Sequence, residues 1–151
     1  MNIAWYYLDK RMATINVLRD HPAMLDTLSD FDTDTLEAEA KLDSIKTSSF
    51  DSMPSAHDPQ AGENRIIQLI QNKDVQNARY QQAMEYMNWF NPAWNKLNVE
   101  DQIVLREFFW NNEDMAEAAE CACKKLGCER TTVYRRKNQA LDRLSFFLYG
   151  K

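Results

Sequence analysis

Apolar residues recur every three or four positions through much of the chain, the spacing that places them on one face of an α-helix. The first section of this repeat comprises Ala4, Leu8, Arg11, Ile15 and Leu18. We expect an interruption at His21-Pro22, because a residue that precedes proline is disfavoured in the helical conformation. The acidic run from Asp30 to Glu39 leads into a further stretch of helical spacing, with Leu36, Ala40, Leu42 and Ile45. Residues 1–46 are therefore predicted to form an N-terminal helical segment.

Residues 47–62 show no periodicity and concentrate Ser, Asp, Pro and Gly. This composition is typical of a loop or a disordered segment, so we expect a flexible linker here. A long stretch without regular structure is uncommon inside a compact domain, so the linker is expected to join two helical units.

A long central helix is predicted over residues 63–96, with Ile66, Leu69, Tyr80 and Met87 on its apolar stripe. We expect Asn91-Pro92 to end this helix. Lys73 and Gln76 dilute the stripe in its middle. The helix could pair with the N-terminal helix as an antiparallel hairpin or with a second copy of itself, and the pattern alone does not distinguish the two.

Three shorter helices are predicted over residues 97–151. Asn98 is expected to cap the first of them, whose stripe ends at Asn111-Asn112. The second runs from about Asp114 to Leu126, with Met115 and a row of alanines facing inward. Gly127 stands where a helix end needs a left-handed residue, and Glu129-Arg130-Thr131-Thr132 opens a third helix that runs to about Leu148. Two helices joined by a short turn with glycine are typical of a helix-turn-helix domain.

The composition agrees with an all-α fold. The chain has only three glycines and four prolines in 151 residues, too little turn chemistry for a many-stranded sandwich or barrel. We therefore predict an N-terminal helical segment and a long central helix, followed by a helix-turn-helix domain.

The net charge of −5 at first argues against a partner as negative as nucleic acid. Residues 1–123, however, hold ten Lys and Arg against 21 Asp and Glu, a net −11, whereas residues 124–151 have a net +6. A basic end attached to an acidic body indicates that the end meets an anion.

The third helix of the C-terminal domain has the side chains that base reading requires. Val133, Ala140, Leu141 and Leu144 share one side at 100° per residue, while polar residues that can hydrogen-bond to base edges occupy the other. Arg130, Arg136 and Lys137 flank this outer face, and Tyr134 could touch a phosphate or sugar. The outer face consists of Thr131, Thr132, Arg135, Asn138 and Gln139.

Residues 97–150 resemble region four of the sigma factors. The resemblance rests on Leu97–Leu105, Leu126–Tyr134 and Ala140–Leu144. More narrowly, the chain is similar to small phage and prophage transcriptional regulators of the ArpU/RinA kind. Those proteins also have a linker like Thr47–Pro54 and an end like Leu148-Tyr149-Gly150.

This resemblance implies promoter binding and control of phage genes, often late ones, with or upon bacterial RNA polymerase. It implies a recognition helix over residues 129–144. The residues expected to contact DNA, with the two lysines of the basic run before the turn, are Arg130, Thr131, Thr132, Tyr134, Arg135, Arg136, Gln139, Lys124 and Lys125.

Two features depart from the family pattern. The family often has an aliphatic residue where Arg136 or Lys137 stands, so we expect Val133, Ala140 and an aliphatic stem to close this helix onto the core. Residues 111–120 also form a longer connection than usual, which leaves the start of the second helix uncertain by a few residues.

Other chemistries are not indicated. Cys121 and Cys123 point about 200° apart on a helix and cannot share a metal ion, so we predict no metal site. The sequence has no Gly-rich phosphate loop, His-Glu-x-x-His or Gly-x-Ser-x-Gly motif, so we also predict no cofactor and no enzymatic activity. The odd number of cysteines, no signal peptide and no apolar run of membrane length favour a cytoplasmic protein. We expect the four tryptophans to be core and interface anchors; alternatively, Trp89, Phe90 and Trp94 could form a partner-binding patch.

Two classes of function remain open from the sequence. In the first, the chain is a sequence-specific regulator on double-stranded DNA, whose N-terminal and central helices form a homodimer or contact polymerase. In the second, the helix-turn-helix serves DNA packaging, as in small terminase subunits, or binds protein only. Packaging subunits usually need a ring-forming central coil, which the diluted stripe supports poorly.

Overall fold

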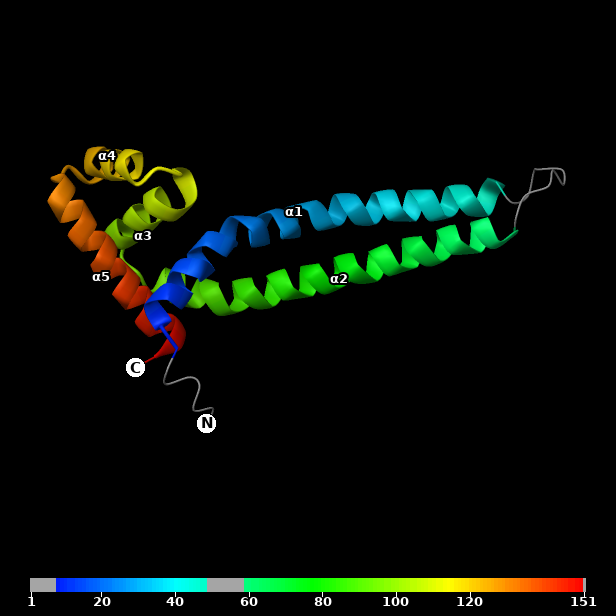
Figure 1. Ribbon diagram of the computed structural model, residues 1–151, viewed down its shortest axis with the longest axis horizontal. Helices are drawn as coiled ribbons and strands as arrows, with labels where there is room; N and C mark the ends of the chain where they lie inside the picture. Colours follow the sequence, from blue (N-terminus) through cyan, green and yellow to red (C-terminus); the bar gives the residue numbers. More distant parts are fainter. Residues whose placement is uncertain (1–7, 49–58, 151) are drawn as a thin grey trace. The chain divides into compact units, whose positions relative to one another are not determined.

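The computed structural model describes residues 8–48 and 59–150, and over these ranges the fold is all-α with no strand. No helix in this part of the chain is both long and apolar enough to cross a bilayer. Figure 1 shows the helices in chain order. They are α1 (Lys10–Ser48), α2 (Pro59–Asn95), α3 (Val99–Arg106), the π-helical turn η2 (Glu107–Asn111), α4 (Met115–Leu126) and α5 (Arg130–Tyr149).

The chain divides into two compact units that cut across the long helices. One unit contains the described residues between 24 and 85, and the other contains residues 8–23 together with residues 86–150. The start of α1 and the end of α2 therefore belong to the same unit as α3, η2, α4 and α5. We call the first the hairpin unit and the second the C-terminal unit.

The hairpin unit consists of α1 and α2 lying side by side in opposite directions (Figure 1). Phe31 of α1 stacks on Tyr80 of α2 with ring centroids 4.0 Å apart. Lys73 Nζ lies 3.5 Å from Glu39 Oε1, so a lysine that interrupts the apolar stripe has a carboxylate partner across the seam. The central helix therefore pairs with the N-terminal helix of its own chain, the first of the two arrangements that the pattern allowed.

Helices α1 and α2 both extend into residues 47–62, which the sequence predicted to be a linker. Helix α1 continues to Ser48 and α2 begins at Pro59, so the linker boundaries were wrong at both ends; residues 49–58 lie outside the described residues. Proline is favourable as the first residue of a helix, because its missing N–H has no partner there and its φ is already helical. Pro59 thus starts α2 rather than belonging to a loop.

The expected interruption at His21-Pro22 is wrong, since α1 runs unbroken through Pro22. Proline removes the N–H that would bond to the carbonyl four residues earlier, which belongs to Leu18. Trp110 Nε1 donates to this Leu18 oxygen at 2.8 Å, and Tyr86 Oη donates to the neighbouring carbonyl of Val17 at 2.6 Å. The Trp110 side chain, distant in sequence, therefore replaces the missing helix bond, and Tyr86 adds a donor at the carbonyl beside it.

The expected end of the central helix at Asn91-Pro92 is also wrong, because α2 continues to Asn95. The residues after the proline are Ala93 and Trp94, which are 4% and 6% exposed in the core. Their burial offsets the loss of one backbone hydrogen bond. The amide of Gln102 then donates to the Trp94 carbonyl at 3.0 Å and so satisfies a carbonyl at the end of the helix.

The C-terminal unit has two apolar clusters. The larger one joins the start of α1, the end of α2, α3 and the second half of α5. Its members include Leu18, Phe90, Leu105 and Leu141, each at most 1% exposed. The smaller one joins α3, η2, α4 and the start of α5 through Val104, Phe108, Ala118, Ala119, Ala122 and Val133.

The small cluster explains the alanine row in α4. Ala118, Ala119 and Ala122 are fully buried, and small side chains allow neighbouring helices to approach closely. Met115 was expected to face inward with them, but 54% of it is exposed, because it is the first residue of α4 and lies outside the cluster. Asp114 is the N-cap of α4, and its side-chain oxygen accepts a hydrogen bond from the Ala116 N–H at 3.3 Å.

Candidate nucleic-acid interface

The turn between α4 and α5 is short and has the predicted chemistry. Gly127 has φ 62° and ψ 35°, the left-handed conformation that glycine adopts without a steric penalty, and its N–H bonds to the Cys123 carbonyl. Only Cys128 and Glu129 separate it from the first residue of α5. Helices α4 and α5 then pack together through the small apolar cluster.

The two sides of α5 separate as predicted. Val133, Ala140, Leu141 and Leu144 are at most 1% exposed. On the opposite side, the exposed residues are Thr131, Arg135, Asn138 and Gln139, and Thr132 is half-buried. We call these five residues the outer face of α5.

Four of the eight cations of the basic end pair with carboxylates, three of them on α3 or η2. Arg136 pairs with Glu100 and Arg143 pairs with Asp101, both on α3. Lys125 Nζ lies 2.5 Å from Glu107 Oε1 in η2, and Lys124 lies 2.7 Å from Glu120 within α4. Much of the +6 charge is therefore paired within this unit, and three of these pairs connect α4 or α5 to α3 and η2.

Glu107 is the most enclosed of these carboxylates. Its side chain is 4% exposed and accepts from the amides of Asn111 at 2.7 Å and Asn112 at 3.1 Å in addition to Lys125. Burial tends to raise the pKa of Glu107, but the bonds from Lys125, Asn111 and Asn112 outweigh it and lower that pKa below its ordinary value. Lys125, a predicted DNA contact, is thus held on a structural carboxylate.

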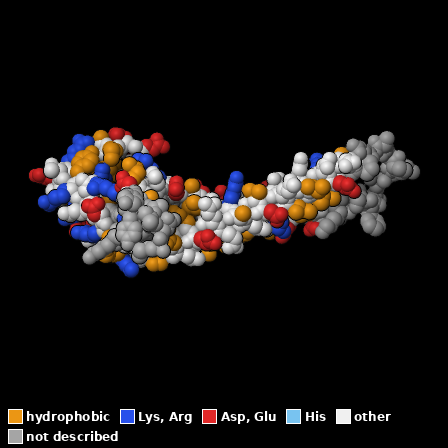
Figure 2. Space-filling model, turned by 60° about the horizontal axis from the view of Figure 1, so that its bottom comes forward, with side chains coloured by type: hydrophobic (Ala, Val, Ile, Leu, Met, Phe, Trp, Pro, Cys, Tyr) orange, Lys and Arg blue, Asp and Glu red, His pale blue; other side chains and the backbone are white. Residues whose placement is uncertain are grey.

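Arg130 and Arg135 make no ion pair within the described residues, and both are exposed. They stand at the first and sixth positions of α5, on the half of the helix nearest the turn. Lys and Arg side chains are seen over the C-terminal unit on the face drawn in Figure 2. Arg130 and Arg135 are therefore the predicted contacts best placed to meet an external anion.

Lys137 and Tyr134 cover the small cluster. The Lys137 ammonium lies 4.9 Å from the centroid of the Phe108 ring and 5.3 Å from that of Tyr134. Burial, and secondarily the charge of Arg11, lowers the pKa of Lys137. Lys137 thus covers the edge of the small cluster with its ammonium over two aromatic rings. Tyr134 Oη lies 3.5 Å from the Met115 carbonyl, so this tyrosine faces α4.

Sequence reasoning missed Arg11, which it placed within the apolar stripe of the first helix. The Arg11 side chain is 47% exposed, and its Nη2 donates to Asn138 Oδ1 at 2.7 Å. Its Nη1 lies 3.6 Å from Asp142 Oδ1. No sequence signal connects residues 127 positions apart, so only the fold brings Arg11 to α5.

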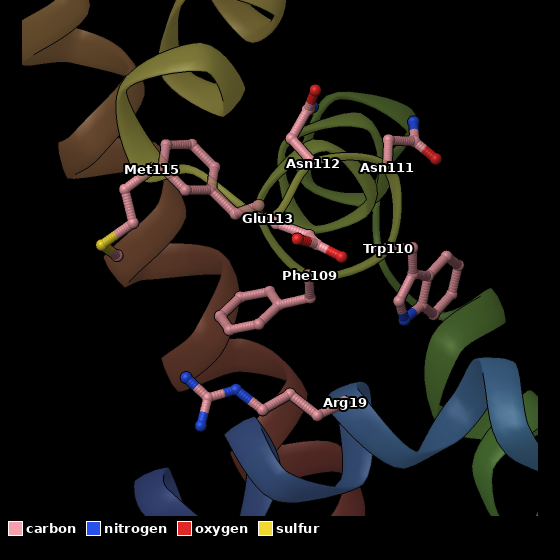
Figure 3. Close-up of a pocket in the computed structure, with 8 residues that line it drawn as sticks. Arg19, Phe109, Trp110, Asn111, Asn112, Glu113 and Met115 are labelled. Atoms are coloured by element: carbon pink, nitrogen blue, oxygen red, sulfur yellow. The ribbon is translucent and has the colours of Figure 1, made fainter.

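A pocket of about 540 Å³ lies beside η2, within the same unit. Figure 3 shows Arg19 of α1 and Phe109, Trp110 and Glu113 among its lining side chains. None of the lining residues belongs to α5, so this pocket is separate from the outer face of that helix.

The remaining candidates have structural contacts. Phe90 and Trp94 are buried, so the suggested patch with Trp89 is wrong, and Trp89 alone of the three is exposed. Trp5 lies outside the described residues. The three cysteines are free and half-buried, and the described residues contain no group of three potential metal-ligating side chains.

Comparison of the chain with protein-family models, with curated proteins and with solved structures finds no match.

Proposed function

We propose that the protein is a sequence-specific regulator of transcription that binds double-stranded DNA with the outer face of α5. The observation that carries this proposal is the distribution of polar groups on that helix. Thr131, Arg135 and Gln139 are exposed and stand four residues apart, so they share one side of α5. The opposite side of this helix packs in the core. Arg, Gln, Asn and Thr are the residue types that read base edges in the major groove.

The two unpaired arginines support the same proposal. Because Arg136, Arg143 and Lys125 are held by carboxylates of the domain, the cations left for an external partner are concentrated near the start of α5. In helix-turn-helix proteins, the first turns of the second helix contact the base edges. The resemblance to sigma region four adds promoter DNA of phage or prophage genes, late ones in particular, and bacterial RNA polymerase as the proposed setting in the host cytoplasm.

We also propose that the protein acts as a homodimer. The hairpin unit exposes large apolar side chains, among them Ile67, Ile70 and Val75, each about half exposed. Orange side chains are visible along the hairpin unit on the face drawn in Figure 2. Exposed apolar surface of this kind favours a protein partner, and two copies would place two reading helices on one operator.

The experiment that tests the function is a pull-down of genomic fragments by the purified protein, followed by sequencing. The proposal expects a shared motif in the captured fragments that lies upstream of genes. Capture without any motif, or no capture at low salt, would contradict it.

A further inference from the structure

The first turn of α1 reaches the outer face of α5 through one side chain. Arg11 donates to the Asn138 side-chain oxygen at 2.7 Å, and both residues are exposed. Thr131, Arg135 and Asn138 are spaced four and three residues apart, so they lie in one row on α5. Arg11 therefore contacts the row of residues to which we assign base reading, and this inference rests on that proposed function.

The contact fixes which end of the Asn138 amide faces outward. A guanidinium has only hydrogen-bond donors, so it must face the amide oxygen. The NH₂ group of Asn138 consequently points away from Arg11 and presents two donors. A free asparagine could turn its amide over; Asn138 with Arg11 in place is held in one orientation.

Orientation of the amide changes which base it fits. Bidentate reading of adenine by asparagine uses the amide oxygen and the NH₂ group together, on N6 and N7. The Asn138 oxygen has two lone pairs, one of which already accepts from Arg11, so an adenine N6 amine would have to share this oxygen with a cationic donor. Guanine instead presents two adjacent acceptors, N7 and O6, which suit an NH₂ donor. We propose that Arg11 is a positioning residue for specificity: it holds Asn138 as a hydrogen-bond donor and makes this position of α5 read guanine rather than adenine.

A second contact of the same guanidinium agrees with this role. Asp142 follows Asn138 by one turn on the same side of α5, and its carboxylate would repel DNA phosphates. Arg11 Nη1 lies 3.6 Å from this carboxylate. Arg11 thus offsets the negative charge at the end of the row, where it also orients Asn138.

The test is selection of binding sites from a pool of random duplexes by the full-length protein, read by sequencing. Wild type, Arg11→Ala and Asn138→Ala are compared, with Arg19→Ala as the matched control. Arg19 is an exposed arginine of the same helix, and within the described residues it makes no ion pair with α5. Thermal melting confirms that each variant is folded.

We expect wild type and Arg19→Ala to select the same motif, with guanine at one position that Asn138→Ala no longer specifies. Arg11→Ala should lower the preference for guanine over adenine at that position by about tenfold and leave the others unchanged. An Arg11→Ala motif identical to that of wild type, or adenine at the Asn138-dependent position, overturns this inference while the proposed function stands. If wild type selects no motif at all, the proposed function itself fails and the inference with it.

Discussion

Lys124 and Lys125 are adjacent at the end of α4 but have different partners. Lys125 lies on the buried Glu107 carboxylate, whereas Lys124 and its partner Glu120 are both about 70% exposed. We expect Lys125→Ala to lower the free energy of unfolding by about 1–2 kcal/mol, because a buried carboxylate loses one donor but keeps two asparagine amides. Urea unfolding followed by circular dichroism measures this.

Lys124→Ala is the matched control for that experiment. It should leave the unfolding midpoint unchanged, since exposed ion pairs contribute little, but should weaken DNA binding and reduce the salt slope by about one. If Lys125→Ala leaves stability unchanged and weakens DNA binding as Lys124→Ala does, then Lys125 is a DNA contact and its pairing with Glu107 has no structural importance.

His21 predicts a pH dependence of stability. The residue is 8% exposed, and its ring stacks on Trp110 with centroids 4.1 Å apart. Burial, and secondarily the charge of Arg106, lowers the pKa of His21 below its ordinary 6.5. The unfolded state therefore binds this proton more readily, so the stabilisation is complete above pH 6.5 and decreases as the pH falls below it.

We expect the unfolding free energy of wild type to fall more steeply than that of His21→Gln between about pH 7.5 and pH 5.5. The difference between the two slopes isolates this residue, because all other titrating groups are common to both proteins. Parallel pH profiles would show that His21 is protonated equally well in the folded and unfolded states.

At the scale of the helices, the continuity of α1 through Pro22 depends on Trp110. Trp110→Phe keeps an aromatic ring but removes the N–H that donates to the Leu18 carbonyl. We expect a cost of about 1–3 kcal/mol, because an acceptor in the core loses its donor. In a Pro22→Ala background the alanine N–H can bond to that carbonyl, so the same substitution should cost less.

This double-mutant cycle separates the hydrogen bond from packing, since the change at Trp110 is identical in both backgrounds. Denaturant unfolding of the four proteins should give a coupling energy of about 1 kcal/mol. Additive effects would contradict our explanation of how α1 passes its proline.

The helices of the C-terminal unit were predictable because their signals are local. The Asn98 cap, the left-handed Gly127 and the buried side of α5 all follow from residues within one or two turns. Pro22 misled because its compensating partner, Trp110 of η2, is far away in sequence. Local rules assign a helix break to proline, and only tertiary contacts reverse it.

The candidate interface was predictable to a similar extent. Periodicity alone predicts that Thr131 and Arg135 lie in one exposed row, and both side chains are exposed to solvent in the structure. Periodicity could not tell which cations are engaged within the domain, because the carboxylates of α3 and η2 that pair with Arg136, Arg143 and Lys125 are 18 to 42 residues away in sequence. Periodicity could not predict the contact between Arg11 and Asn138 either, because these residues are 127 positions apart.

Across the whole molecule, the net charge of +6 on residues 124–151 overstates the positive charge that is available to an external anion. The positive charge of the C-terminal residues serves partly to bind α4 and α5 to α3 and η2. Fewer cations therefore remain for phosphates than the +6 implies. We expect a shallow dependence of DNA affinity on salt, with a slope that corresponds to only a few phosphate contacts per copy.

The mass of the particle in solution separates the two classes of function. Light scattering should give twice the chain mass of 17.7 kDa for the proposed dimer. Replacing Ile67 and Ile70 by Ser should shift the mass toward the monomer if the hairpin unit forms the interface. A ring of many copies would contradict the regulator and favour a DNA-packaging subunit.

Base reading by α5 is tested by comparing Arg135→Ala with wild type on two duplexes, one carrying the selected motif and one a scrambled sequence. Fluorescence anisotropy at one fixed salt concentration gives the ratio of the two affinities. If the outer face of α5 reads bases, wild type binds the motif far more tightly, and Arg135→Ala reduces this ratio by about tenfold or more. An unchanged ratio, or an equal loss on both duplexes as expected for Lys124→Ala, would contradict base reading by this helix.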